Sequence, residues 1–534
     1  MSWRFYLFFS VLGLACAFFV ASFQRSPGYM DADYYFAGGT RLAGGYGFNE
    51  EILWNFLDDA VGLPHPSHGY WMPLVSILAS LGMALRGSTS FQAARIPFLF
   101  LMASVPPLTG ALAWRLHKRR QAAWLAASLA LLPAFYLPFL PTTDGFGLTM
   151  VLGGSFFLLM TFQVGDLEHE FQAPWRNLLK ALALGVLAGL LYLTRVDGAL
   201  WLAFALIALS LKKRKIVRGT MRWDGMALLI CLAGFFLVSL PWMARNWSVF
   251  GTIFSPGGSR ALWITDYDEL FIYPASLLTP QRWFSSGAGA ILRARLWSAG
   301  QNLQSALAVQ GAIFLTPLIL AGMWRMRRNR VVQIAAIAWA VIFAVMTLVF
   351  PFQGARGGFF HSGAALQPLF WAIAPAGLTD FVDWGARHRG WRKSQAEVFF
   401  SLSLIGLSLL LSAFVAYHRF RHIEDGTNAW NRSFVRYSLL EAELQRRGFT
   451  HQEIMMVNNS PGYYIASQRR AISIPYADLS TVCAAAHRYR VTLLVLEIDQ
   501  IPGASELFSN PSDRLCLRYL GTFEDVRIFQ VHSP

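Results

Sequence analysis

Carboxylate side chains are scarce in this chain of 534 residues, and several of them stand in polar loops directly beside long apolar runs. Asp31 and Asp33 follow the first apolar run, and Asp144 and Asp197 each stand between two later runs. Carboxylates gathered at one membrane surface can hold a divalent metal or act as a general base. The alternative is that each acid caps or anchors a helix end, because aspartate is a favourable N-cap residue.

The composition indicates which elements must position these acids. The chain is 55% hydrophobic and 14% charged, with a mean hydropathy of +0.41, whereas soluble proteins contain about 25% charged residues. Its apolar runs are each about 20 residues long, which is the length that a helix needs to cross a bilayer core of about 30 Å. These values exclude a single water-soluble domain and predict an α-helical polytopic membrane protein.

The distribution of positive charge predicts the orientation of the helices. The formal net charge of +15 comes from 45 Lys and Arg against 30 Asp and Glu, and all six lysines fall in short segments between apolar runs. Positive residues concentrate in the cytoplasmic loops of membrane proteins. The clusters therefore indicate cytoplasmic loops and not a nucleic-acid surface. The lysines are Lys118, Lys180, Lys212, Lys213, Lys215 and Lys393.

The apolar segment 71–85 determines the sidedness of every later loop. At about 15 residues it is short for a membrane span, and if it did span, every basic cluster would lie outside, against the positive-inside rule. We therefore predict about eleven spans, a cytoplasmic N-terminus at the cell membrane, and an interfacial helix at 71–85 in the first extracytoplasmic loop. The predicted spans are about 3–23, 94–114, 122–140, 146–163, 179–193, 198–211, 224–243, 305–323, 331–351, 364–380 and 396–416.

The composition changes after about residue 417, in a segment that this topology places outside the cytoplasm. Helical and strand patterns alternate there, which is typical of a small α/β domain. We therefore expect a transmembrane module at 1–416 and an extracytoplasmic α/β domain at 417–534, with Cys483 and Cys516 as a candidate disulfide pair. The predicted helices are 433–447 and 478–488, and the predicted strands are 453–458, 491–497, 515–520 and 525–531.

Short motifs around the acids resemble those of one enzyme superfamily. Met-Asp-Ala-Asp-Tyr-Tyr opens the first external loop, His-Gly-Tyr-Trp-Met-Pro-Leu leads into the segment 71–85, and Thr-Asp-Gly-Phe surrounds the acid of the next external loop. This order resembles the GT-C glycosyltransferases. That superfamily includes the protein O-mannosyltransferases (family 39), the aminoarabinose transferases that modify lipid A (family 83) and the catalytic subunit of oligosaccharyltransferase. The resemblance covers about residues 1–416 and implies the GT-C fold.

The resemblance also implies roles for the acids. In this superfamily an aspartate early in the first external loop, often within Asp-Glu-x-x-Tyr, acts as general base or acceptor-side carboxylate. Asp31 and Tyr35 match that motif here, but Ala32 stands in place of the glutamate and Asp33 follows. The choice between Asp31 and Asp33 as the base therefore stays open. Asp144 matches the second acidic motif of these enzymes.

Basic residues are the candidates for binding phosphate or metal. His65 and His68 occupy the place where members of the superfamily have a cation or metal ligand, and the alternative is that they only brace the loop. Arginine can hold a phosphate through two hydrogen bonds. Arg245, Arg356 and His361 are therefore candidates for the donor phosphate, unless the arginines contact lipid headgroups at helix ends.

Together these features predict a membrane glycosyltransferase, a hexosyl- or pentosyltransferase, with Asp31 as the general base. It would take a sugar from a polyprenyl-phosphate donor and pass it to a protein, lipid or glycan acceptor on the extracytoplasmic face. Membrane lipids are expected partners, nucleic acid is not, and a divalent metal is a candidate cofactor. The alternatives are a transporter or flippase of lipid-linked sugars, which would carry charge within its spans, and a noncatalytic membrane scaffold.

Overall fold

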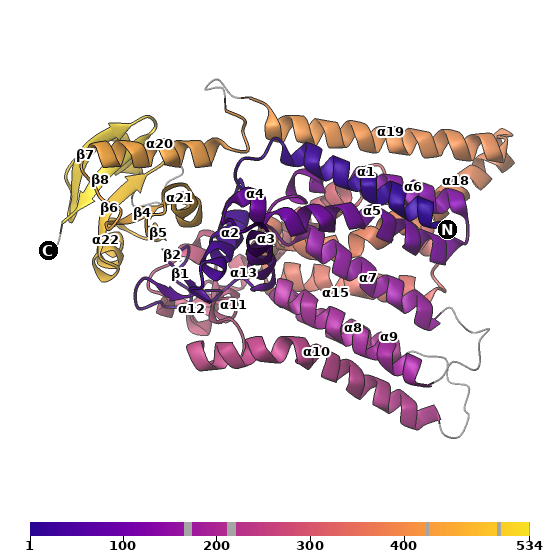
Figure 1. Cartoon of the computed structure of the whole chain (residues 1–534). Coiled ribbons are helices and arrows are strands. Elements are labelled where there is room, and N and C mark those ends of the chain that lie inside the picture. The colour runs from indigo at the N-terminus through magenta and orange to yellow at the C-terminus, as the bar shows by residue number, and fades with distance from the viewer. Residues whose placement is uncertain (165–173, 211–219, 423–426, 499–503, 533–534) are drawn as a thin grey trace. The chain divides into compact units, whose positions relative to one another are not determined.

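The computed structural model of the chain describes residues 1–164, 174–210, 220–422, 427–498 and 504–532 (Figure 1). It divides into two compact units, each built from three stretches of sequence. Residues 1–22, 97–245 and 295–419 form the helical unit, and residues 23–96, 246–294 and 420–534 form the sheet unit. Lys212, Lys213 and Lys215, which contribute to the predicted topology, lie outside the described residues.

Long apolar helices make up the helical unit. In the described part of the chain, six helices are long and apolar enough to cross a membrane. An apolar helix satisfies its own backbone hydrogen bonds, as a bilayer requires. The prediction of a helical, multi-pass membrane protein is therefore confirmed, while the count of eleven spans stays a prediction. The helices are α1 (Trp3–Ala21), α5 (Ile96–His117), α6 (Arg120–Leu131), α7 (Phe146–Val164), α8 (Pro174–Thr194), α9 (Leu200–Ser210), α10 (Thr220–Phe250), α13 (Ala288–Ser305), α14 (Thr316–Arg325), α15 (Arg330–Ala344), α16 (Pro351–Gln353), α17 (Phe359–Gly363), α18 (Gln367–Arg389) and α19 (Lys393–Phe420).

Three segments that were predicted as continuous spans are interrupted. The segment 122–140 consists of α6 and the 3-10 helix η1 (Ala134–Phe139), because Pro133 and Pro138 cannot donate helical hydrogen bonds. The segment 305–323 contains the π-helix η6 (Ala306–Gln310) before α14, and 331–351 ends in the π-helix η7 (Val345–Val349). Such π-turns are frequent at functional sites.

Helices α14 and α18 approach so closely that each contributes a glycine to the contact. A Cβ atom on Gly322 would lie 2.6 Å from the carbonyl oxygen of Ile373, and one on Gly377 would lie 2.0 Å from that of Leu318. Helices in a membrane associate mainly by packing, and small residues allow their backbones to approach. Neither position has room for a side chain unless a helix moves.

A six-stranded sheet in the order β2-β5-β4-β6-β8-β7 forms the centre of the sheet unit. The first four strands in that order are parallel, and β8 and β7 are antiparallel to their neighbours. The α/β character and the strands predicted beyond residue 417 are confirmed, whereas β2 and β5 were not predicted. The strands are β2 (Ile52–Leu53), β4 (Ile454–Val457), β5 (Ala471–Ser473), β6 (Val491–Leu496), β7 (Leu517–Phe523) and β8 (Val526–Val531).

Apolar cores cover both faces of this sheet. Successive side chains of a strand point to opposite faces, so Met456 of β4 packs in a cluster with Val482 of α22 (Leu479–Arg488). Met455 points to the other face and packs in a second apolar cluster with Leu440 of α20 (Arg432–Arg446). The predicted helices at 433–447 and 478–488 are these two. Cys483 and Cys516 form a disulfide bond, so their candidate pairing is confirmed.

The loop after α1 contributes its own helices to the sheet unit. Helix α3 (Leu74–Arg86) corresponds to the predicted interfacial segment 71–85. Its 13 residues extend about 20 Å, which is too short for a hydrocarbon core of about 30 Å. The remaining elements of the unit are α2 (Met30–Ala43), α4 (Phe91–Ala94), β1 (Asn49–Glu50), β3 (His65–Pro66), α11 (Pro256–Arg260), η3 (Ala261–Trp263), η4 (Asp268–Phe271), η5 (Ala275–Leu277), α12 (Pro280–Ser285), α21 (Ser460–Ser467) and α23 (Ser505–Ser509).

Cysteine labelling tests the predicted orientation. In a chain carrying Cys16→Ser and Cys231→Ser, the cysteines that remain form the disulfide bond. We expect Val61→Cys to react with an impermeant maleimide in intact cells, because Val61 is 88% exposed in the first loop. Arg328→Cys, at an exposed position between α14 and α15, should react only after the membrane is permeabilised.

A buried position provides the control for this experiment. Ser67 lies in the same loop as Val61 but is 1% exposed, so Ser67→Cys should react only after denaturation. Reaction of Val61→Cys and Arg328→Cys from the same side would contradict the predicted topology, including the assignment of the acidic loops to the extracytoplasmic side.

Candidate active site

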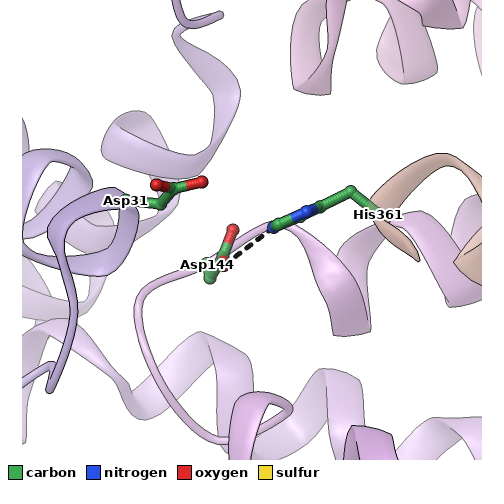
Figure 2. Close-up of side chains that lie close together, drawn as sticks. All are labelled: Asp31, Asp144 and His361. Carbon is green, nitrogen blue, oxygen red and sulfur yellow. Dashed lines mark hydrogen bonds and ion pairs between the residues drawn. The ribbon is translucent and has the colours of Figure 1, made fainter. Parts of the chain in front are cut away.

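Asp31 and Asp33 occupy the first turn of α2. Acids are favoured there because the first turn carries the positive end of the helix dipole, which helps to explain why the helix begins at Met30. Residues two positions apart on a helix project about 200° apart, so the two carboxylates point in nearly opposite directions. Asp31, labelled in Figure 2, is partly exposed, whereas Asp33 is 4% exposed.

Asp33 points into the sheet unit and contacts the C-terminal part of the chain. The Nδ2 atom of Asn459 donates a hydrogen bond to Oδ2 of Asp33 at 3.1 Å. The pKa of Asp33 is raised from its ordinary 3.8 to about 7, mainly by burial and in small part by the charge of nearby Asp31, while the hydrogen bond from Asn459 opposes the shift. Asp33 is thus a buried acid that titrates near neutral pH.

Asn459 was missed by the reasoning from sequence. It is the N-cap residue of α21, and its Oδ1 accepts a hydrogen bond from the backbone N–H of Gly462 at 3.0 Å. The signal was present, because Asn459 is followed by Ser460 and Pro461, and an asparagine with a proline in the first helical turn after it is a typical helix start. The sequence contained no sign, however, that this cap would reach α2.

Asp144 and His361 contact each other in the helical unit (Figure 2). The Nε2 atom of His361 lies 3.1 Å from Oδ2 of Asp144, and its Nδ1 lies 3.0 Å from the carbonyl oxygen of Gly357. Asp144 is 1% exposed and precedes α7. The imidazole of His361 stacks on the ring of Phe146 with 3.9 Å between centroids. The sequence proposed both residues, but not that they meet.

A kink in the backbone positions His361. Gly357 has a φ of +122°, which side chains with a Cβ rarely adopt. This conformation interrupts the helix within the π-turn η8 (Gly354–Gly358) and turns the carbonyl group of Gly357 towards Nδ1 of His361. Since a carbonyl only accepts, Nδ1 must carry a proton. Arg356 lies in the same kink and is exposed.

His65 and His68 are enclosed within the sheet unit. The Nε2 atom of His65 lies 3.0 Å from Glu50, and its Nδ1 lies 3.5 Å from Asp58. Burial lowers the pKa of His65, but the two acids outweigh it and raise the value to about 9. His68 contacts the hydroxyl groups of Ser67 and Ser76. These contacts favour the interpretation that the two histidines brace the loop.

Two other candidates have local partners. Asp197 forms an ion pair with Arg195 at 3.0 Å, and the guanidinium group of Arg245 lies 4.8 Å from the ring centroid of Trp242. Both contacts are of the kind expected at helix ends near a membrane interface. They favour structural roles for Asp197 and Arg245.

Comparisons with known proteins add to this geometry. No family model and no curated protein sequence matches the chain. Solved structures do match. The oligosaccharyltransferase AglB of Archaeoglobus fulgidus, in complex with an inhibitory peptide and a dolichol-phosphate, aligns with a TM-score of 0.58 at 12% identity, over 93% of this chain and 70% of that chain.

Two further structures have the same architecture. ArnT of Cupriavidus metallidurans, bound to undecaprenyl phosphate, aligns over 100% of both chains with a TM-score of 0.54 at 14% identity. The mycobacterial arabinofuranosyltransferase AftD aligns over 100% of this chain and 42% of that chain, with a TM-score of 0.51 at 14% identity. This chain therefore has the fold of the GT-C membrane glycosyltransferases, and the resemblance inferred from its motifs is confirmed at the level of the fold.

The raised pKa of Asp33 predicts how stability depends on pH. The folded protein keeps a proton on Asp33 up to about pH 7, whereas the unfolded chain loses it near pH 3.8. The folded state therefore binds the extra proton in between, and this carboxyl destabilises the fold progressively as the pH rises to about 7. This penalty grows by about 3 kcal/mol between pH 5 and pH 8, and Asp33→Asn should remove it.

Thermal unfolding of the solubilised full-length chain, followed by tryptophan fluorescence, measures this effect. The Tm of Asp33→Asn should exceed that of the wild type by clearly more at pH 8 than at pH 5. Asp266→Asn, at an exposed position of the same unit, is the matched control and should follow the wild type. An equal difference between Asp33→Asn and wild type at both pH values would contradict the shifted pKa.

Proposed function

We propose that this chain is a glycosyltransferase that moves a sugar from a polyprenyl-phosphate donor to an acceptor at the extracytoplasmic face, with Asp31 as the general base. The observation that carries this proposal is a GT-C fold in which an aspartate occupies the first turn of α2, in the first loop. The AglB structure contains a dolichol-phosphate and the ArnT structure contains undecaprenyl phosphate. A lipid phosphate is the chemical feature that these two structures share.

The proposed reaction is a displacement at the anomeric carbon. An oxygen or nitrogen of the acceptor forms a bond to that carbon, while the bond from the carbon to the phosphate oxygen breaks. Asp31 takes the proton from the acceptor, and the polyprenyl phosphate leaves with the bonding electrons. Negative charge grows on the phosphate, so a cationic side chain such as Arg356 would stabilise the transition state.

Asp31 is a better candidate for the base than Asp33. Asp33 is buried and accepts a hydrogen bond from Asn459, so it is engaged within the sheet unit. Asp31 lies on the opposite side of α2 and is partly exposed, as a group that must meet an acceptor has to be. The motif left this choice open, and the burial of Asp33 supports Asp31.

Asp144 and His361 fit a divalent metal better than the other candidate residues do. The proton on Nδ1 of His361 is engaged by the carbonyl group of Gly357, so Nε2 is the atom directed at Asp144. Metal-binding histidines typically have this arrangement, in which one ring nitrogen donates to a carbonyl group. The Archaeoglobus fulgidus oligosaccharyltransferase has been crystallised with zinc and sulfate. Asp144 and His361 would hold such an ion, which would neutralise charge on the departing phosphate.

Substitution of Asp31 tests the proposed base. We expect Asp31→Asn to lower kcat for sugar transfer by about 10²- to 10⁴-fold, because general-base catalysis contributes about that much. The Tm should change little, since the side chain is partly exposed. The measurement is transfer of labelled sugar from a panel of polyprenyl-phosphate donors to envelope fractions, with purified protein in lipid nanodiscs.

Asp197→Asn is the matched control, because it removes another loop carboxylate that already has a local arginine partner. Its kcat should stay within about threefold of the wild type. Full activity of Asp31→Asn together with an inactive Asp33→Asn would instead assign the base to Asp33. If neither the variants nor the wild type transfers sugar from any donor, the proposed glycosyltransferase activity is contradicted.

Substitution of Arg356 tests the donor-phosphate site. Arg356→Ala should raise the KM for the donor by about tenfold or more and change the KM for the acceptor less than threefold, because the loss of a charge-assisted hydrogen bond costs roughly 1.5–3 kcal/mol. Arg356→Lys keeps the charge but not the bidentate geometry, so it should fall between the alanine variant and the wild type. Equal changes in both KM values would argue against a phosphate contact.

A further inference from the structure

Asn459 connects the C-terminal part of the chain to the acid pair of α2. Its Nδ2 donates to Asp33, and its Oδ1 accepts from the backbone N–H of Gly462. One amide therefore caps α21 and holds α2 at the same time. A Cβ atom on Gly462 would lie 2.4 Å from Nδ2 of Asn459 and 2.9 Å from Oδ2 of Asp33, so the backbone of α21 closes tightly over this hydrogen bond.

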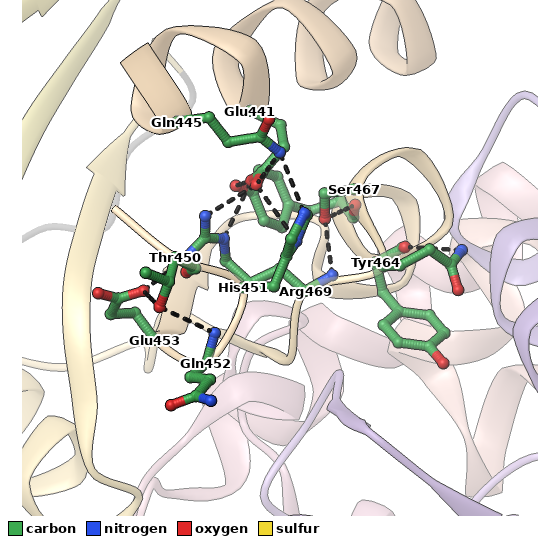
Figure 3. A network of polar contacts seen from close by, with 11 residues as sticks. Glu441, Gln445, Thr450, His451, Gln452, Glu453, Tyr464, Ser467 and Arg469 are labelled. Atoms are coloured by element: carbon green, nitrogen blue, oxygen red, sulfur yellow. Dashed lines mark hydrogen bonds and ion pairs between the residues drawn. The ribbon is translucent and has the colours of Figure 1, made fainter. Parts of the chain in front are cut away.

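A buried network of charged groups fixes α21 itself (Figure 3). The Nε and Nη2 atoms of Arg469 donate to the two carboxylate oxygens of Glu441 in α20, at 3.0 and 2.8 Å. The hydroxyl group of Tyr463 in α21 donates to the same carboxylate at 2.6 Å. Arg469 is 0% exposed, and a charge at that depth depends on such pairing. The network therefore sets the position from which Asn459 reaches Asp33.

The chain just before α2 is held by C-terminal residues as well. The Nε1 atom of Trp430 donates to the carbonyl oxygen of Ser26 at 3.0 Å. The side-chain oxygen of Asn431 accepts from the backbone N–H groups of Arg25 and Ser26 at 2.9 and 3.3 Å. These contacts fix where α2 starts. Further along the helix, the backbone N–H of His68 donates to the hydroxyl group of Tyr34 at 2.8 Å and Gly39 packs against Ala79, so the first loop itself holds the middle of α2. The hydrogen bond from Asn459 to Asp33 holds its first turn.

We propose that Asn459 is a positioning residue for the general base, because its hydrogen bond to Asp33 holds the first turn of α2 and thereby the direction in which Asp31 points. This inference rests on the proposed role of Asp31. Asp31 and Asp33 share one rigid helical turn and project about 200° apart, so an anchor on one determines the direction of the other. Asp33 acts as the anchor point and Asp31 as the reacting group.

Two variants separate this contact from the capping of α21. Asn459→Asp keeps a side-chain oxygen for the N–H of Gly462, since aspartate caps as well as asparagine, but it replaces the amide donor by a second acceptor that faces Asp33. In the double variant Asp33→Asn with Asn459→Asp, the new amide at position 33 can donate to the new carboxylate at position 459. The hydrogen bond is thus restored with its direction reversed. Asn510→Asp, at an exposed position after α23, makes the same chemical change elsewhere and is the control.

Steady-state kinetics and hydrogen–deuterium exchange of the full-length chain in nanodiscs provide two independent measurements. We expect Asn459→Asp to lower kcat by about 10- to 100-fold, because catalysis is sensitive to misplacement of a reacting group by about 1 Å, while the KM for the donor changes less than threefold. Amide exchange in residues 28–43 should rise. The double variant should return kcat to within about fivefold of the wild type and restore the exchange pattern, and Asn510→Asp should match the wild type throughout.

Two results would overturn the positioning role. One is a kcat for Asn459→Asp within threefold of the wild type. The other is a double variant that regains slow exchange but not kcat, since the carboxylate at position 33 would then be needed for more than its hydrogen bond. If the wild type transfers no sugar from any donor, the proposed function fails, but exchange still decides whether Asn459 fixes α2. Unchanged exchange in residues 28–43 of Asn459→Asp would then refute it.

Discussion

The pairing of β2 with β5 is the constraint on which the candidate base depends. Ile52 and Leu53, in the first loop, run parallel to Ala471 and Ile472, more than 400 positions later in the chain. The hydroxyl group of Ser460 donates to the carbonyl oxygen of Leu53 at 3.1 Å, and Arg470 forms an ion pair with Glu51. Leu53 and Ile472 then share one apolar cluster. The first loop therefore contributes the edge strand β2 to the C-terminal sheet, and α2 belongs to the same unit.

Much of the fold could be predicted because its signals are local and strong. Continuous apolar runs indicate helices regardless of what they pack against, and the amphipathic and apolar stretches after residue 430 match α20, β4, α22, β6 and β8 to within a few residues. Strands β2 and β5 have two and three residues, too few for a periodic pattern, and their partners are distant in sequence. The breaks at η6 and η7 were missed because π-turns interrupt helices without a change in hydropathy.

The residues of the candidate site could be predicted from the sequence, but their contacts with one another could not. Asp144 and His361 stood out as polar residues beside apolar runs, yet their pairing depends on the kink at Gly357, where one glycine conformation turns a carbonyl group towards the imidazole. His65 and His68 stood out equally, and the contacts of their rings with Glu50, Asp58, Ser67 and Ser76 favour the alternative that they brace the loop. Composition cannot distinguish these two outcomes, because both depend on what surrounds each ring.

The acid at position 33 makes a hydrogen bond that an apolar residue there could not make. A buried helix start needs an acceptor for the amide of Asn459, and a carboxyl group supplies one close to the proposed base. Two full negative charges on one turn would repel each other, but burial raises the pKa of Asp33 to about 7, so near neutral pH this carboxyl carries less negative charge than an ordinary aspartate. Asp33 can thus anchor the helix while adding less repulsion to Asp31 than an ordinary surface aspartate would. Because Asp33 is buried and Asp31 is partly exposed, Asp31 is the acid of the pair that solvent can reach.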